Sequence, residues 1–508
     1  MAYFASCPIE TPLEPCIFII MGATGDLANR KLLPALFNLF KNKALPDPLT
    51  IVGCGRTEIS LENFRDQTQT ALKNAGIFDA VKWNNFSRTL AYQRLSYEDA
   101  ESGKRLAKAL RSLDRQRKTS GNRFFYLALP PDLYAPAVNL LGDAGLGVEK
   151  SEGLGWSRLV VEKPFGYDLK SAMALDRQIH SHFREHQIFR IDHYLAKETV
   201  QNILIFRFAN AVFEPIWDRK YIASIHITAI ETVGVEHRAG YYDQAGVIRD
   251  MFQNHMMQLL AMTTMEPPPR FESEAVRDEK AKVFSSLRPF PVDDLRAFLI
   301  LGQYARGFST GKVLPAYQEE PGVRSGSLTP TYALMKVFID NWRWQGVPIF
   351  LESGKRLSEK RTEIVITFKD VPHCMFRKTF DEAISPNRLV LGIYPEEHIQ
   401  LSFQTKKAGA KMCLGSAVLD FKYHQNAREL FLGAYEKVLI DCMTGDQMLF
   451  WRQDGVEACW AFLTPILNAC EQCAFRKEML HSYPAGGPRP DAAQALLSLQ
   501  LHNKHDKV

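Results

Sequence analysis

Long apolar runs are missing from this 508-residue sequence. No stretch of about 18 or more uninterrupted apolar residues occurs, so a membrane-spanning helix is not expected. The first ten residues lack the basic start and apolar run of a secretory signal. We therefore expect a cytoplasmic protein with no membrane partner.

A strong charge of either sign is also missing. Lysine and arginine number 62, aspartate and glutamate number 57, and the net charge is +5. This balance excludes a polyacidic protein and a protein that coats nucleic acid, so no nucleic-acid partner is expected. It suits a small anionic molecule as the partner.

Cysteine is sparse, with nine residues, which is an odd number. Several stand in apolar runs, where a free cysteine behaves as a small apolar residue, so a disulfide framework is not expected. Cys470 and Cys473 form the one close pair, and no second pair or suitably spaced histidines complete a zinc site. We expect structural thiols and no metal.

The chain is too long for one ordinary domain, and its first part alternates short buried strands with helical stretches. Residues 16–21 (CIFIIM) form an apolar run without polar alternation, which is typical of a strand buried on both faces of a parallel sheet. Residues 49–52, 123–129 and 158–161 show the same pattern. Residues 1–192 are therefore predicted to form a doubly wound α/β domain of the Rossmann-like, dinucleotide-binding type.

The pattern of apolar and polar residues changes after about residue 192. Residues 224–231 and 362–369 alternate apolar and polar side chains, which predicts strands with one solvated face, and residues 247–264 read as a helix between them. We interpret residues 193–508 as a larger α+β domain with a mainly antiparallel sheet and helices. A loose polar tail is predicted from about residue 484.

Glycines follow the first predicted strand at the point where a helix begins. The stretch Gly22-Ala-Thr-Gly25-Asp-Leu-Ala28 permits a tight turn whose backbone N–H groups approach a pyrophosphate, although a plain pair of turn glycines is the alternative. Arg56 follows the next strand, where a guanidinium can hold a ribose 2′-phosphate, which favours NADP over NAD unless Arg56 is only a solvated loop residue. The predicted cofactor loop consists of Gly22, Ala23, Thr24, Gly25, Asp26 and Leu27.

The stretch RIDHYLAKE, residues 190–198, concentrates groups that can bind a phosphate and handle a proton. His193 and Lys197 are four residues apart and would share one face of a helix, with Tyr194 near them, and Asp192 could orient a base. A solvated, charged helix start is the alternative. Lys163 follows the last strand of the first domain, at the sheet edge where ligands bind.

His255 lies on the apolar stripe of the predicted helix 247–264. A lone histidine there is more often a core residue than a base, because only a partner in a cleft would make it catalytic. Asp250 is five residues earlier, about 140° round an α-helix, so the two would flank a pocket rather than stack. Asp250 and Glu231, taken singly, read as solvated carboxylates.

Taken together, these separated motifs give the chain a resemblance to the glucose-6-phosphate dehydrogenase family. RIDHYLAKE is the most specific of them, and GATGDLA, VEKPFG and RDMFQNHMMQ match in family order, from about Phe18 to about Gly486. The resemblance implies oxidation of glucose 6-phosphate at C1 to 6-phospho-D-glucono-1,5-lactone with hydride transfer to NADP+, the first step of the oxidative pentose phosphate pathway. It also implies a homodimer or homotetramer.

The resemblance assigns roles to residues of this chain. His255 would be the general base, with Asp192 as its orienting carboxylate. Tyr126 and Lys163 would lie near the cofactor, beside the loop and Arg56. The implied substrate ligands are His193, Tyr194, Lys197 and Lys360 towards the phosphate, and Lys163, Glu231, Asp250 and Lys355 towards the hydroxyl groups.

Three positions depart from the family pattern. Asn29 stands where many members carry lysine, Ala196 replaces a glycine, and Lys360 stands where some members have arginine. A second, structural NADP site is not carried over. One alternative stays open, a catalytically silent NADP-binding regulator on the same fold. A hexose-6-phosphate dehydrogenase of the endoplasmic reticulum is not expected, because it would carry a signal peptide and a lactonase domain, and we find neither in this sequence.

Overall fold

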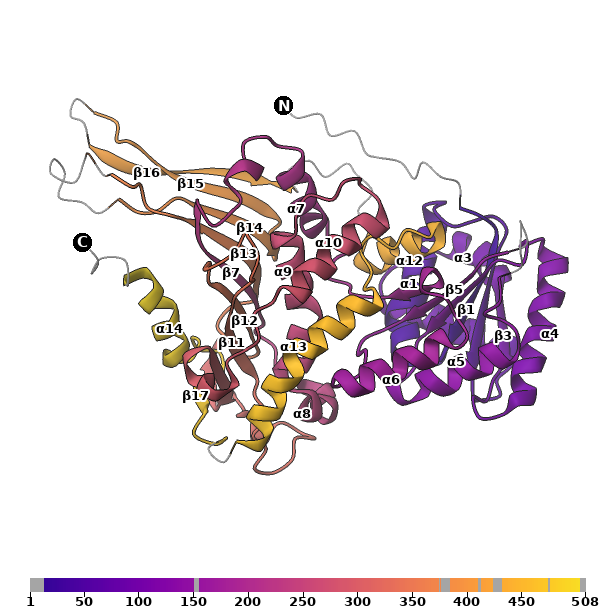
Figure 1. Ribbon diagram of the computed structural model, residues 1–508. Coiled ribbons are helices and arrows are strands. Elements are labelled where there is room, and N and C mark those ends of the chain that lie inside the picture. The colour runs from indigo at the N-terminus through magenta and orange to yellow at the C-terminus, as the bar shows by residue number, and fades with distance from the viewer. Residues whose placement is uncertain are drawn as a thin grey trace. The chain divides into compact units, whose positions relative to one another are not determined.

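The structure is a computed structural model that describes residues 13–149, 155–373, 375, 384–409, 413–423, 432–473 and 476–502. The chain divides into two compact units (Figure 1). Unit 1 takes in Met1–Ala196, Arg270–Arg277 and Arg428–Glu457, and unit 2 takes in Lys197–Pro269, Asp278–Ala427 and Ala458–Val508. Within the described residues, no helix is both long and apolar enough to cross a membrane.

Unit 1 is built on a six-stranded parallel sheet with the strand order β3-β2-β1-β4-β5-β6. Each strand predicted in this part of the chain is confirmed, and the first, CIFIIM, is buried along its whole length. The order reverses between β1 and β4, which is the topological switch point of doubly wound sheets. The strands are β1 (Cys16–Met21), β2 (Leu49–Gly55), β3 (Leu90–Arg94), β4 (Arg123–Leu127), β5 (Ser157–Val161) and β6 (Ile188–Arg190).

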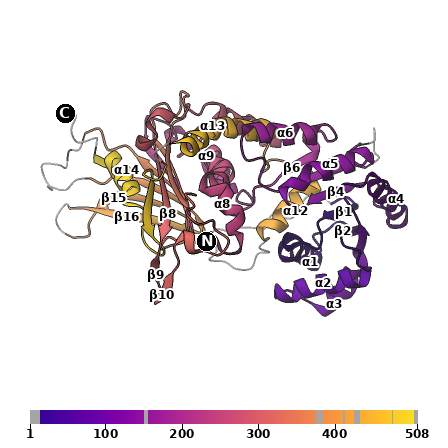
Figure 2. The same ribbon diagram turned by 90° about the horizontal axis from the view of Figure 1, so that it is seen from below.

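Helices cover both faces of this sheet. Figure 2 shows α5 and α6 on one face and α1 and α12 on the other. Apolar side chains of α1 and α12 belong to one core with those of β1, which is how the late segment joins unit 1. The helices are the short π-helix η1 (Ala28–Leu32), α1 (Leu33–Lys41), α2 (Leu61–Asn74), α3 (Ala80–Phe86), α4 (Ala100–Arg117), α5 (Tyr134–Asp143), α6 (Leu169–His180) and α12 (Ala434–Thr444).

Unit 2 is built on a nine-stranded sheet with the order β16-β15-β14-β13-β7-β12-β11-β8-β17. Most neighbours are antiparallel, as predicted, but β7 pairs with β12 and β8 pairs with β17 in parallel. The strands are β7 (Ile222–Ile230), β8 (Leu299–Ala305), β11 (Tyr332–Val337), β12 (Ile349–Gly354), β13 (Arg361–Phe368), β14 (Arg388–Tyr394), β15 (His398–Lys406), β16 (Leu414–Lys422) and β17 (Leu480–Pro484), and a separate hairpin consists of β9 (Gly307–Ser309) and β10 (Lys312–Leu314).

The main helices of unit 2 include α7 and α9 on one side of the sheet, with α14 on the other (Figure 1). The predicted helix 247–264 is confirmed, but its first half is a π-helix, η7. The helices are α7 (Glu198–Phe208), α8 (Ala239–Val247), η7 (Ile248–Met256), α9 (Met257–Thr264) and α14 (Asp491–His502), while α10 (Ser273–Ser285) and α13 (Gln453–Gln472) each begin in unit 1 and continue in unit 2.

Two expectations about the chain's organisation differ from the structure. The loose tail predicted from about residue 484 is wrong for Asp491–His502, which form α14, and Ala493 on it is fully buried. The division after residue 192 did not anticipate that two later segments, Arg270–Arg277 and Arg428–Glu457, return to the first unit. Long-range packing of this kind leaves no local periodicity in the sequence.

The described cysteines are free thiols, as expected. Burial raises the pKa of Cys16 and of Cys54 to about 12, so both are protonated at neutral pH. Cys470 is buried and Cys473 is partly exposed. Cys7 and Cys374 lie outside the described residues.

Candidate functional site

The predicted cofactor loop leaves the carboxyl end of β1 between the ends of β2 and β4. Gly22 has φ +90°, and a Cβ there would lie 2.3 Å from the carbonyl oxygen of Ala128, so only glycine fits. The N–H groups of Gly22 and Ala23 both donate to the Cys54 carbonyl, at 2.8 and 2.9 Å. The loop is therefore fixed at the point where doubly wound sheets bind dinucleotides.

Asn29, one of the three residues that depart from the family pattern, is hydrogen-bonded to the backbone of this loop. Its Nδ2 donates to the carbonyl oxygens of Gly25 at 2.9 Å and Thr24 at 3.2 Å. The side chain thus stabilises the backbone of the loop, a role that lysine could not fill with the same geometry because an ammonium is not a planar amide.

Arg56 is exposed at the carboxyl end of β2. The neighbouring strand β3 fixes the two residues that follow Arg56. The Tyr92 hydroxyl donates to the Thr57 carbonyl at 2.7 Å, and Arg94 forms an ion pair with Glu58 at 2.9 Å. Two guanidinium groups therefore lie at adjacent strand ends. This donor set fits a ribose 2′-phosphate, and together with the glycine loop it fits NADP.

The loop that follows β5 carries Glu162 and Lys163. Glu162 accepts from the Tyr126 hydroxyl at 2.5 Å and from the Tyr435 hydroxyl at 3.3 Å, and burial raises its pKa. Tyr126 itself is fully buried, and its described hydrogen bond is the one to Glu162. The Lys163-Pro164 peptide bond is cis.

Asp192, His193 and Tyr194 lie in a turn rather than on a helix. Asp192 is buried, and its Oδ1 accepts from the Tyr194 N–H at 3.0 Å, which closes the turn. The helix begins only at Glu198, with Lys197 as its N-cap. The expectation that His193 and Lys197 share a helix face was therefore wrong, because the Asp192 side chain competes for the backbone as N-terminal aspartates do.

In unit 2, Glu231 and Lys355 emerge side by side. Ile230 and Gly354 are register partners in the parallel pair β7 and β12, so the residues that follow them leave the sheet together. Lys355 Nζ donates to Glu231 Oε2 at 2.7 Å and lies 5.3 Å from the centre of the Tyr242 ring. A positive and a negative group are thus presented at one strand end, where they can contact the hydroxyl groups of a sugar.

Two predicted phosphate ligands lie against one aromatic ring. Lys197 Nζ is 5.2 Å and Lys360 Nζ is 4.3 Å from the centre of the Tyr394 ring. Tyr394 ends β14, and 38% of it is exposed. The ring attracts both ammonium groups and holds two positive charges near one another, which suits a dianionic phosphate.

The helix η7 carries the remaining residues, Asp250 and His255, which are 3% and 2% exposed. The expected angle of about 140° between them does not apply, because it assumes 3.6 residues per turn. A π-helix pairs residues five apart, so its wider turn brings these two positions nearer to one side. Arg238 Nη2 lies 3.9 Å from Asp250 Oδ1.

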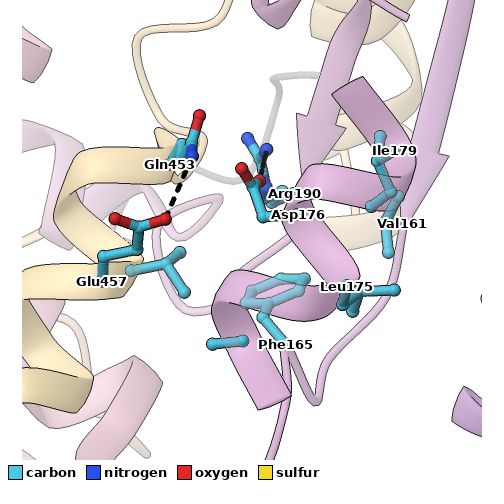
Figure 3. A pocket seen from close by; sticks show the side chains of 10 residues that line it. Val161, Phe165, Leu175, Asp176, Ile179, Arg190, Gln453 and Glu457 are labelled. Atoms are coloured by element: carbon cyan, nitrogen blue, oxygen red, sulfur yellow. Dashed lines mark hydrogen bonds and ion pairs between the residues drawn. The ribbon is translucent and has the colours of Figure 1, made fainter. Parts of the chain in front are cut away.

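Unit 1 also contains a pocket with a different lining. Figure 3 shows it between α6 and the start of α13, with Phe165 and Ile179 on its wall. Its polar groups are paired: Arg190 with Asp176 at 2.6 Å, and Gln453 with Glu457 at 3.0 Å. None of the predicted site residues lines it, so we assign it no ligand.

Sequence reasoning missed several residues that the structure ties to the site. Tyr394 could have been noticed as an aromatic residue at the end of an alternating strand. Arg94 could have been found from the parallel order of β2 and β3. Glu162 gave no local signal, because its contacts with Tyr126 and Tyr435 join segments far apart in the chain. Arg238 lies close to Asp250 in sequence, but no regular spacing marks their contact.

The parallel sheet, the glycine loop at its switch point and the guanidinium groups beside it define an NAD(P)-dependent oxidoreductase. Residues 19–202 match the family model "Glucose-6-phosphate dehydrogenase, NAD binding domain", and residues 204–505 match "Glucose-6-phosphate dehydrogenase, C-terminal domain". The chain belongs to the glucose-6-phosphate dehydrogenase family.

Individual relatives agree with this assignment. The chain is 45% identical to the glucose-6-phosphate 1-dehydrogenase of Aggregatibacter actinomycetemcomitans, over 96% of each chain. It is 39% identical to that of Bacillus subtilis, over 96% of this chain and 98% of the relative. A solved structure of glucose-6-phosphate dehydrogenase in complex with its substrate glucose 6-phosphate superposes with a TM-score of 0.88 at 35% identity, covering 97% of this chain and 99% of the other.

Proposed function

We propose that this protein oxidises D-glucose 6-phosphate at C1 to 6-phospho-D-glucono-1,5-lactone. The observation that carries this proposal is the likeness, over 97% of the chain, to a structure that holds glucose 6-phosphate as its substrate. The family's cofactor is NADP, which accepts the hydride when bound. The reaction is the first step of the oxidative pentose phosphate pathway.

His255 is the general base of this proposal. C1 of the sugar is a hemiacetal carbon, so its hydroxyl must lose a proton as the C=O bond forms, and a neutral imidazole suits that step near pH 7. His255 is 2% exposed, which keeps water from competing for the proton. Asp192 is assigned to fix the tautomer of the imidazole and to stabilise the imidazolium that forms.

The substrate's other groups are assigned by charge. Lys197 and Lys360, which both lie close to the Tyr394 ring, bind the phosphate together with His193 and Tyr194. The hydroxyl groups are assigned to Lys163, Glu231, Asp250 and Lys355. The ion pair of Glu231 and Lys355 supports this, because it presents one acceptor and one donor in a fixed arrangement.

The residues assigned to the cofactor are Arg56 and the loop from Gly22 to Leu27, with Tyr126 and Lys163 near them. The exposed guanidinium of Arg56 at the end of β2 supports NADP rather than NAD. A cytoplasmic location also belongs to this proposal, on the composition of the chain.

We also propose a homodimer or homotetramer. The strand β16 ends the described sheet, and its Val418, Leu419 and Phe421 are 56%, 60% and 39% exposed. Apolar side chains on an edge strand favour association with another chain. Light scattering on purified protein checks the assembly, and a monomer at micromolar concentration would contradict it.

The catalytic proposal is tested by mixing the purified protein with glucose 6-phosphate and NADP+ and following absorbance at the NADPH band. We expect NADPH to accumulate with glucose 6-phosphate and far less with unphosphorylated glucose. NADP binding without any NADPH formation would instead support the silent regulator.

A further inference from the structure

The side chain of Asn254 joins the backbone of Asp250 to that of His255. Its Nδ2 donates to the Asp250 carbonyl oxygen at 3.2 Å, and its Oδ1 accepts from the His255 N–H at 2.5 Å. All three residues are at most 3% exposed. Water therefore does not compete for these two hydrogen bonds, and the loss of either partner leaves a buried polar group.

These contacts lie across one turn of the π-helix η7. In a π-helix the carbonyl of residue i faces the N–H of residue i+5, and Asp250 and His255 are such a pair. A π-helical turn is rare because it is less favourable than an α-helical one. An amide that offers one donor and one acceptor to the two ends of the turn stabilises the wider geometry.

Other polar side chains on the same helical segment share only the first of these two bonds, the one to a carbonyl four positions earlier. Thr263 and Thr264, on α9, donate to the carbonyls of Leu259 and Leu260 at 2.6 and 2.7 Å. These are ordinary bonds to the residue four positions earlier, within an α-helix. The bond that Asn254 accepts from the His255 N–H is thus what distinguishes the π-helical turn from the rest of the segment.

We propose that Asn254 is a positioning residue, which holds the π-helical turn and so sets the directions of the Asp250 and His255 side chains. The proposal rests on the function proposed above, in which His255 takes the C1 hydroxyl proton and Asp250 contacts the sugar. If the turn relaxed to an α-helix, these positions would be about 140° apart. The base and the sugar ligand would then no longer face the same substrate.

The first test compares Asn254→Ala with Thr264→Val. The control also removes one buried bond from a side chain to the backbone, but it lies outside the π-helical turn. We expect Asn254→Ala to lower kcat by roughly 10- to 100-fold, as misplaced catalytic groups do, with NADP binding unchanged. The control should keep kcat within about twofold for a comparable fall in Tm. Equal kcat in the two variants would overturn the proposal.

The second test reads the turn itself, by crystal structures of the wild type and of Asn254→Ala. We expect the π-helical turn in the former and an α-helical turn in the latter, whereas a retained π-helix would overturn the proposal. This outcome is independent of activity, so it is distinguishable from a failure of His255 as the base.

Should the alanine variant not fold, Asn254→Asp is the second variant, because it keeps the size of the side chain but not the N–H donor. It should also move the acid limb of the kcat/KM profile to higher pH. An unmoved acid limb with normal kcat would contradict the role.

Discussion

Lys355 and Glu231 form an ion pair of 2.7 Å between the carboxyl ends of two parallel strands in a sheet that is otherwise mostly antiparallel. Their side chains are only 13% and 26% exposed, so the pair is better shielded from solvent than a surface salt bridge. The lysine holds the carboxylate in place at the strand end.

Lys355→Met should raise KM for glucose 6-phosphate and lower kcat/KM, since it removes a donor and leaves Glu231 without its described partner. Glu231→Gln and the double variant complete a mutant cycle in kcat/KM. We expect a coupling of about 0.5–3 kcal/mol, as for residues in contact. Strictly additive losses would show that the two residues act on the substrate independently.

His255→Asn keeps the size of the side chain and some hydrogen bonding but removes the base. We expect kcat to fall by roughly 10² to 10⁴, while the Kd for glucose 6-phosphate changes little. Steady-state kinetics and a separate binding measurement check this. An unchanged kcat would remove His255 from the mechanism.

Lys197→Ala should show the opposite profile, with KM for the sugar phosphate raised more than kcat falls. One charged contact to a phosphate contributes about 1.5–3 kcal/mol, so KM should rise by roughly 10- to 150-fold. Lys369→Ala, an exposed lysine at the end of β13, is the control and should leave KM unaltered. A drop in turnover at constant KM would exclude Lys197 as a phosphate ligand.

Arg56→Ala should weaken the binding of NADP and leave the binding of NAD nearly unchanged, because only NADP carries the 2′-phosphate. The measurement is kcat/KM with both cofactors, and alanine substitution of the exposed Arg111 on α4 is the matched control. Equal losses with the two cofactors would mean that Arg56 only supports the fold. A residual preference for NADP is expected from Arg94, which lies at the end of the neighbouring strand.

The contacts of His180 with two carboxylates predict that the stability of unit 1 depends on pH. Hydrogen bonds to Asp176 and then Glu185 raise its pKa to about 10, above the value of about 6.5 in an unfolded chain. Its stabilising contribution is therefore complete below about pH 6.5 and is lost as the pH rises towards 10, at no more than about 1.4 kcal/mol per pH unit.

The free energy of unfolding of His180→Gln, measured against the wild type, checks this expectation. The difference should be largest at pH 6 and shrink by pH 10. His481→Gln on β17 is the control, since the structure describes no ion pair for that residue. A difference between wild type and His180→Gln that stays constant with pH would show that the proton is not shared with the two carboxylates.

Much of unit 1 could be predicted because its signals are local. An apolar run of six residues followed by a glycine turn and a helical stripe determines β1, the cofactor loop and α1 whatever the rest of the chain does. Arg56 and Lys163 were found in the same way, as residues that follow buried strands. In a parallel sheet, sequence position at a strand end already determines which edge a side chain reaches.

The tertiary structure decided what depends on pairing between distant segments. The parallel register of β7 with β12 brings Glu231 to Lys355, and the position of β14 brings Tyr394 close to both Lys197 and Lys360. The π-helical turn at Asp250 and His255 is likewise hidden from a 3.6-residue periodicity. The sequence by itself determined which residue types were available, because propensity and hydrophobic pattern are read over a few neighbours. Strand register and the packing of remote segments are set by many weak contacts at once, and these exist only in the folded chain.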